Sequence, residues 1–176
     1  MGMGYIGLPT AALLAKNGYQ VCGVDVKKNV VDIINDGKVH IFEPDLDSLV
    51  SSSVNDGLLI ASSEPKESDI FIIAVPTPFH KNKSNKITNT PVPNIDYIIN
   101  AIVKIAPFIR AGNLVLLEST SPLGTTEMIA NILEKEGVDS SSIFIAHSPE
   151  RVLPGQIIKE LVDNDRIVGG INTEST

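Results

Sequence analysis

The first chemical feature of the sequence is a glycine-rich turn followed by an acidic residue. Gly2, Gly4 and Gly7 spell G-x-G-x-x-G, and Asp25 stands 18 residues beyond the last glycine. In such a turn the backbone comes close to the diphosphate of a bound dinucleotide. The free amide groups at the start of the next helix attract that diphosphate, and we expect Gly4 to lie closest to it. An acidic side chain roughly 20 residues further on accepts hydrogen bonds from an adenosine ribose. Because that carboxylate would repel a ribose phosphate, the pattern predicts an NAD site and disfavours NADP.

The same residues also fit an ordinary glycine-rich turn beside a surface aspartate, so the surrounding elements matter. Short β-branched runs alternate with helical stretches along nearly the whole chain, which is typical of a parallel sheet flanked by helices. The strand expected over residues 20–26 puts Asp25 at its carboxyl end, where doubly wound sheets bind their ligands. We therefore predict a single α/β domain over residues 1–176, a Rossmann-like doubly wound parallel sheet with flanking helices.

The expected elements follow one another with short connections. Helices are expected over residues 8–17, 28–35, 46–55, 97–109, 125–136 and 156–162. Strands are expected over residues 20–26, 58–63, 69–75, 113–119, 143–147 and 166–170. Residues 76–96 hold four prolines and a polar stretch of Lys and Asn, which predicts a long mobile loop.

The position of the glycine turn raises a question about the sheet. In a doubly wound sheet the turn follows a central first strand, yet here it occupies the first residues of the chain. We expect the sheet to lack that strand, as in a fragment or a sequence with a misassigned start. A missing central strand exposes two edges, so we also expect low stability.

Composition excludes several other classes of protein. A net charge of -7 provides no basic field for nucleic acid, and the aliphatic runs are too short to cross a bilayer. One cysteine, Cys22, cannot form an internal disulfide. His40, His80 and His147 lack the spacing of metal ligands, so no metal is expected. These observations favour a cytoplasmic protein without nucleic-acid or membrane partners.

Three loops at predicted strand ends carry hydroxyl groups and prolines. They read VPTP, ESTSPLGTTE and SPERVLPG, and they would face the ligand edge of the sheet. Such residues can form a rigid wall around a nicotinamide ring, although they also serve in ordinary turns.

Taken in order, the motifs resemble those of a known family. GMGYIGLPTA, GVDV, HIFEPDL, AVPTPF, LLESTSPLGTTE and SPERVLPG are together similar to the amino-terminal, NAD-binding domain of the UDP-glucose/GDP-mannose dehydrogenases, and the resemblance covers almost all 176 residues. P-T-P and P-E-R-V-L favour the members that oxidise UDP-N-acetylmannosamine, since those acting on UDP-glucose tend to carry N-T-P and P-E-F-L. UDP-glucose or GDP-mannose oxidation remains the alternative.

The resemblance implies a reaction and assigns roles to residues. Enzymes of this family oxidise a primary alcohol of a nucleotide sugar to a carboxylate by two hydride transfers to NAD, through an aldehyde and an enzyme-bound thioester. The residues implied to contact NAD are Gly2, Gly4, Tyr5, Ile6, Asp25, Pro76, Thr77, Ser119 and Thr120. Glu150 is implied to activate water or handle protons in thioester hydrolysis, and Thr120 to help position that water. Contacts with the nucleotide sugar fall to Arg151, Val152 and Leu153.

Each of these roles has a simpler alternative. Glu150 suits proton handling if partial burial raises its pKa, but Glu150 and Arg151 also fit a surface charge pair. His147 follows an apolar strand and is expected to be a core or rim residue. Lysines in the predicted loop are expected to form a solvated face, or to approach a phosphate on closure; they are Lys81, Lys83 and Lys86.

The cysteine nucleophile of the family has no counterpart here. It would come from sequence beyond Thr176, together with a lysine, an asparagine, a UDP-binding domain and the helix that makes most of the dimer contact of the full-length homodimer. Cys22 lies in an apolar strand and is expected to be structural. The chain would then hold the cofactor half of an active site and be inactive alone. A stand-alone nucleotide-binding or regulatory module is the rival interpretation.

Overall fold

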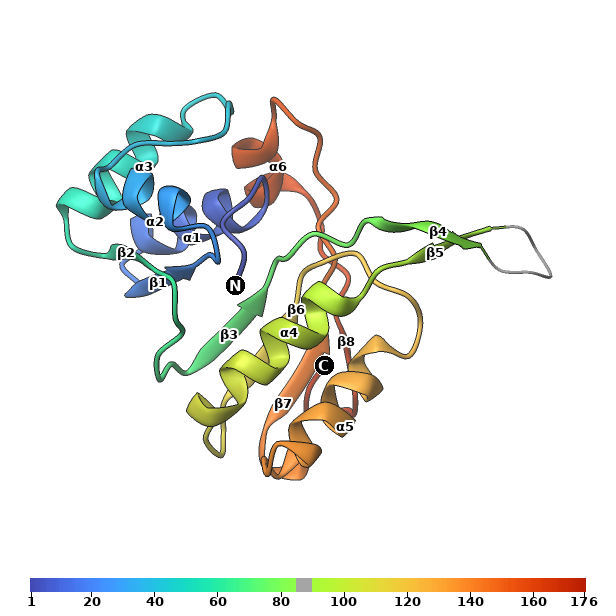
Figure 1. Cartoon of the computed structure of the whole chain (residues 1–176). Coiled ribbons are helices and arrows are strands. Elements are labelled where there is room, and N and C mark those ends of the chain that lie inside the picture. Colours follow the sequence, from blue (N-terminus) through green and yellow to red (C-terminus); the bar gives the residue numbers. More distant parts are fainter. Residues whose placement is uncertain (85–89) are drawn as a thin grey trace.

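Strands from distant parts of the sequence form a small parallel sheet and a larger, mainly parallel sheet in the computed structural model, which describes residues 1–84 and 90–176. The smaller sheet pairs β1 (Val21–Val24) with β2 (Leu59–Ser62). The larger has the order β3 (Ile70–Ile73), β6 (Leu114–Leu117), β7 (Phe144–His147) and β8 (Gly169–Gly170). The parallel pairing and the flanking helices confirm the predicted Rossmann-like α/β class (Figure 1).

The helices cover the sheets in two groups. They are α1 (Gly7–Lys16), α2 (Lys28–Asn35), α3 (Leu46–Asn55), α4 (Asp96–Ile105), α5 (Thr125–Lys135) and α6 (Ile157–Asp163), with 3-10 turns at Ala106–Phe108 and Ser140–Ser142. Ile98, Ile102 and Ile105 lie on one face of α4 and pack into the core beneath the larger sheet. A second core joins α1, α2 and α3 to β1 and β2, with Leu8 and Ile34 fully buried.

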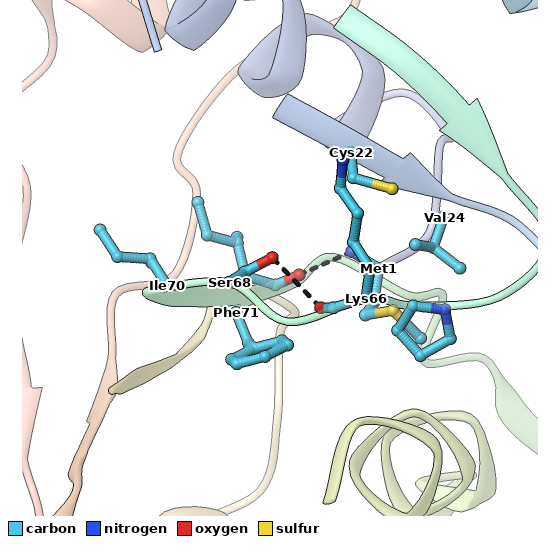
Figure 2. Close-up of a pocket in the computed structure, with 9 residues that line it drawn as sticks. Met1, Cys22, Val24, Lys66, Ser68, Ile70 and Phe71 are labelled. Carbon is cyan, nitrogen blue, oxygen red and sulfur yellow. Dashed lines mark hydrogen bonds between the residues drawn. The ribbon is translucent and has the colours of Figure 1, made fainter. Parts of the chain in front are cut away.

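A gap separates the two sheets where a central strand would lie. The first two residues bridge it: the Met1 amine donates to the Ile72 carbonyl at 2.7 Å, and the Gly2 amide donates to the Val24 carbonyl at 2.8 Å. A cavity of about 560 Å³ opens between β1 and β3. Figure 2 shows a second pocket next to this cavity, which Cys22 of β1 and Met1 both line. Within residues 1–84 and 90–176, no strand lies between β1 and β3.

The prediction of a long loop over residues 76–96 is wrong, because this segment contains two paired strands. Strands β4 (Phe79–Ser84) and β5 (Pro91–Pro93) pair antiparallel and project away from the sheets (Figure 1). Proline lacks a donor, but a two-stranded ribbon leaves one edge of each strand free, so prolines are tolerated there. Lys86 lies outside the described residues, as do the side chains of Lys81 and Lys83.

Two other expectations need correction at the ends of elements. The helix expected over residues 97–109 is regular only to Ile105, since Pro107 cannot donate an i to i-4 hydrogen bond and the last turn tightens to a 3-10 form. The strand expected over residues 166–170 is reduced to Gly169–Gly170, and it runs antiparallel to β7. The sheet is therefore mainly, not wholly, parallel.

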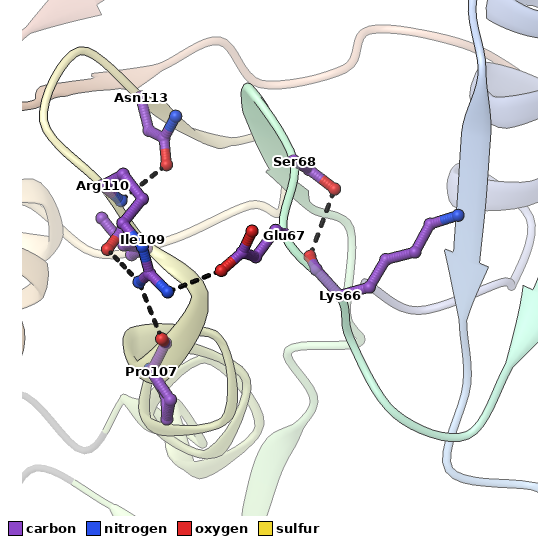
Figure 3. A network of polar contacts seen from close by, with 7 residues as sticks. All are labelled: Lys66, Glu67, Ser68, Pro107, Ile109, Arg110 and Asn113. Carbon is purple, nitrogen blue, oxygen red and sulfur yellow. Dashed lines mark hydrogen bonds and ion pairs between the residues drawn. The ribbon is translucent and has the colours of Figure 1, made fainter.

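A polar network fixes the amino-terminal ends of β3 and β6, opposite the ligand edge. The Arg110 guanidinium donates to Glu67 Oε1 at 2.6 Å and to the carbonyls of Pro107 and Ile109 at 2.9 Å each (Figure 3). The Asn113 side chain accepts from the Arg110 amide at 2.7 Å. The network therefore joins the segments that lead into β3 and β6.

Candidate functional site

The parallel register brings the predicted site residues to one edge of the sheets. Ile73 pairs with Leu117, which pairs with His147, so β3, β6 and β7 end side by side. The loops that follow them carry Thr77, Ser119 and Glu150, and the glycine turn and Asp25 lie at the same edge beside the end of β1.

The glycine turn leads directly into α1, whose first turn suits an anion. Among the described residues no side chain caps this helix, and its first turn holds no acidic residue, so its amide groups carry the positive end of the helix dipole. Gly2 has a φ of +87°, which favours glycine. A Cβ on Gly7 would stand 1.8 Å from the Gly2 carbonyl oxygen, so no other residue fits there. A Cβ on Gly4 would meet nothing within 4 Å in the described part of the chain, which leaves room for a ligand.

Asp25 lies at the end of β1 with both carboxylate oxygens fixed. Oδ2 accepts from the Met3 amide at 3.0 Å and Oδ1 accepts from the Lys27 amide at 2.9 Å. Each carboxylate oxygen can accept a second hydrogen bond, so the group can still bind two ribose hydroxyls. The glycine turn, the uncapped helix and this carboxylate fit NAD. When bound, NAD supplies a nicotinamide ring that accepts hydride.

Ser119 ties together two of the loops expected along the nicotinamide half of the site. Its hydroxyl lies 3.1 Å from the Ile73 carbonyl oxygen and 2.8 Å from that of Val75, so the end of β6 is joined to the segment leading to Pro76. Ser119 is buried, while Pro76 and Thr120 are exposed and Thr77 is half-buried. Tyr5 is exposed and Ile6 half-buried at the glycine turn. Their contacts with NAD remain predictions.

Glu150 has the environment of a proton-handling group. Its Oε2 is buried and has no hydrogen-bond partner in residues 1–84 and 90–176, which argues against a surface charge pair with Arg151. Burial raises the pKa of Glu150, while its own backbone amide, Arg166 and His147 oppose the rise. Glu150 thus meets the condition of partial burial that suits proton handling, and its catalytic role remains a prediction.

Sequence reasoning missed an ion pair near Glu150 in which the carboxylate is buried and the guanidinium is partly exposed. Glu118, which is 3% exposed, accepts from Arg166 Nη1 at 3.1 Å and from the Thr10 hydroxyl at 3.3 Å. Burial raises the pKa of Glu118, although Arg166 and Thr10 oppose that rise. A charged residue directly after the apolar run LVLL was the available signal. Arg166 thus bonds to Glu118 and also acts electrostatically on Glu150.

The residues expected to contact the nucleotide sugar follow Glu150 in the segment 148–156, which joins β7 to α6. Arg151 and Leu153 are exposed and Val152 is half-buried, so the first two are free to meet a ligand. Sequence reasoning gave no role to Glu43 of HIFEPDL, yet this buried side chain accepts from the amides of Gly155 and Ile157, at 2.8 and 2.6 Å.

The remaining candidates behave as structural residues. His147 is half-buried at the rim, with Nε2 3.2 Å from the Ser119 carbonyl oxygen. Burial raises the pKa of the Cys22 thiol, which supports its expected structural role. Within the described ranges, no three His, Cys, Asp or Glu residues gather in a way that could hold a metal ion. A search of the same residues finds no helix with the length and apolar character needed to span a membrane.

The chain is similar to nucleotide-sugar dehydrogenases in sequence. It is 54% identical to the UDP-N-acetyl-D-mannosamine dehydrogenase of Campylobacter jejuni over 97% of this chain and 42% of that protein. It is 48% identical to an NDP-N-acetyl-D-galactosaminuronic acid dehydrogenase of Ralstonia nicotianae, over 97% of this chain and 41% of that protein. The chain thus spans less than half the length of these relatives.

Solved structures agree with the sequence comparison. The fold matches that of the UDP-D-ManNAc dehydrogenase of Pyrococcus horikoshii with a TM-score of 0.90 and 40% sequence identity, over 99% of this chain and 41% of that one. A family model, described as the UDP-glucose/GDP-mannose dehydrogenase family, NAD binding domain, matches residues 1–176. The chain therefore belongs to the UDP-glucose/GDP-mannose dehydrogenase family and is an NAD-binding domain of that family.

Proposed function

We propose that this domain serves a dehydrogenase that oxidises C6 of UDP-N-acetylmannosamine, giving UDP-N-acetylmannosaminuronate for polysaccharide biosynthesis. The identity of 54% to a relative named for this sugar is the observation that carries the proposal. The second relative is named for another N-acetylated sugar, which favours a 2-acetamido sugar as the substrate class. UDP-glucose and GDP-mannose are the alternatives.

The overall reaction balances with two equivalents of NAD. The group R-CH₂OH, one water and two NAD⁺ give R-COO⁻, two NADH and three protons. In this proposal the α1 amino terminus binds the diphosphate of NAD, and Asp25 binds the adenosine ribose. Glu150 accepts a proton from the water that hydrolyses the thioester, with Thr120 holding that water, and Arg151 to Leu153 contact the sugar. The reacting cysteine comes from outside residues 1–176.

The proposal includes a homodimeric full-length enzyme in the cytoplasm that has no nucleic-acid partner. The net charge of -7 supports the last point.

Turnover of four sugars by a full-length enzyme containing residues 1–176 tests the proposed substrate. UDP-N-acetylmannosamine, UDP-N-acetylgalactosamine, UDP-glucose and GDP-mannose are compared by NADH absorbance at equal concentration. The proposal expects the highest kcat/KM for UDP-N-acetylmannosamine. A higher value for UDP-glucose or GDP-mannose would overturn it, and absence of turnover with every sugar would favour the nucleotide-binding module.

A further inference from the structure

The segment 148–156, hereafter the substrate loop, crosses from one half of the molecule to the other. It leaves β7, in the larger sheet, and enters α6, which lies beside α1 of the smaller half (Figure 1). The Ser148 amide donates to the Leu117 carbonyl at 3.0 Å, which fixes the start of the loop to β6. Between these supports the loop carries Glu150 and Arg151 across the carboxyl edge.

Two other polar contacts of the substrate loop come from α6 and from the residue after it. The Leu153 amide donates to Glu160 Oε2 at 2.7 Å, and the Asn164 side chain donates to the Arg151 carbonyl at 2.8 Å. Because Glu160 and Asn164 are part of α6 or next to it, these bonds hold the loop to its own helix. They do not set where the loop and helix stand relative to the glycine turn and α1.

Apolar packing brings α6 to the smaller half without defining its direction. Ile157 is 1% exposed, and Ile158 packs against the core formed by α1, α2 and α3. Such contacts are non-directional and allow a short helix to shift or rotate. A directional contact between the halves is needed to fix the end of the loop.

Glu43 supplies that contact. It lies between α2 and α3, is 5% exposed, and is separated from Gly155 by 112 residues in sequence. Its Oε2 accepts from the Gly155 amide at 2.8 Å and its Oε1 from the Ile157 amide at 2.6 Å. Both bonds are charge-assisted and short, and together they fix the carboxylate plane against the first turn of α6. A buried carboxylate is tolerated when hydrogen-bonded in this way.

We propose that Glu43 is a positioning residue that holds the substrate loop in its sugar-binding conformation across the carboxyl edge. This inference rests on the proposed function, since it takes Arg151, Val152 and Leu153 to contact the nucleotide sugar. It gives a role to the HIFEPDL motif, which stands far from the loop in sequence.

Glu43→Gln is the sharpest test, because the amide keeps the shape but can accept only one of the two bonds and presents an NH₂ group to the other N–H. In the full-length enzyme, KM for UDP-N-acetylmannosamine should rise about ten- to hundredfold, as expected for a shifted binding group. The dissociation constant for NAD should stay within twofold. Asp47→Asn, which changes an exposed carboxylate in the first turn of α3, is the matched control and should leave both constants unchanged.

Amide hydrogen exchange on residues 1–176 tests whether the hydrogen bonds to Glu43 are lost, independently of any change in KM. In Glu43→Gln the Gly155 and Ile157 amides should exchange faster, while those of β6 and β7 keep their protection. Faster exchange with an unchanged KM would overturn the positioning role, and so would a rise in KM matched by an equal loss of NAD affinity. A wild-type enzyme inactive on all four sugars would instead refute the proposed function.

Discussion

Arg166 Nη1 lies 3.1 Å from Glu118 Oε1, and this pair joins the segment before β8 to the end of β6. The Glu118 side chain is almost fully buried, while that of Arg166 is 30% exposed. Burial of Glu118 raises its pKa, and Glu150 adds a smaller contribution in the same direction. The guanidinium therefore offsets the charge of two neighbouring carboxylates.

Replacing Arg166 by alanine should make stability more sensitive to pH. A carboxyl group whose pKa is raised in the folded state binds its proton more tightly there than in the unfolded state. The free energy of unfolding therefore falls as pH rises from the ordinary pKa of Glu to the raised pKa of the folded state. Without Arg166 the pKa of Glu118 rises further and the fall deepens. We expect Arg166→Ala to lose roughly 1–3 kcal/mol at pH 8 and less at pH 5.

Urea unfolding at both pH values measures this difference. Lys28→Ala, which removes the exposed ion pair with Asp32, is the control and should lose at most about 0.5 kcal/mol. An equal loss for Arg166→Ala at pH 5 and pH 8 would contradict the account.

Two glycine substitutions should separate packing from ligand binding. Gly7→Ala places a Cβ against the Gly2 carbonyl, so it should disrupt the turn, lower stability and abolish NAD binding. Gly4→Ala meets no described atom within 4 Å, so the melting temperature should change little while NAD affinity falls at least about tenfold. Thermal melts and calorimetric titrations of both variants check this. Unchanged NAD binding by Gly4→Ala would place the diphosphate elsewhere.

An apolar extension ahead of Met1 should stabilise the domain. Five or six β-branched residues would fill the gap between β1 and β3 and pair with both edges. Urea unfolding of the extended and original chains, with a glycine-serine extension of equal length as control, measures the gain. Equal stability of the two extended chains would contradict this interpretation of the gap.

The same extension should remove a pH dependence of the original chain. Burial lowers the pKa of the Met1 amine from 8.0 to about 6, so the unfolded state binds more protons between these values. Stability of the original chain should therefore rise as pH increases from 6 to 8. In the extended chain this nitrogen is an amide and does not titrate, so the rise should vanish.

The sequence predicted local features well because each depended on nearby residues. The helical stretches between β-branched runs marked α1, α2 and α3, and the apolar run before Asp25 marked β1. The β4–β5 hairpin was missed because prolines and polar residues obscure the alternation of a solvent-exposed ribbon.

The predicted site residues lie along one edge of the sheets because parallel strands end together, which the order of elements implies. The carboxylates Glu43 and Glu118 escaped notice because their partners, Ile157 and Arg166, are distant in sequence. Only the folded chain shows that these charges are buried.

Calorimetric titration of residues 1–176 with NAD and NADP tests the central claim most directly, alongside Asp25→Ala and the exposed control Asp56→Ala. We expect the wild type and Asp56→Ala to bind NAD, and to bind NADP at least about tenfold more weakly than NAD. Asp25→Ala should lose most of its affinity for NAD. Equal binding of NAD by wild type and Asp25→Ala, or preference for NADP, would contradict the assignment of this edge as the NAD site.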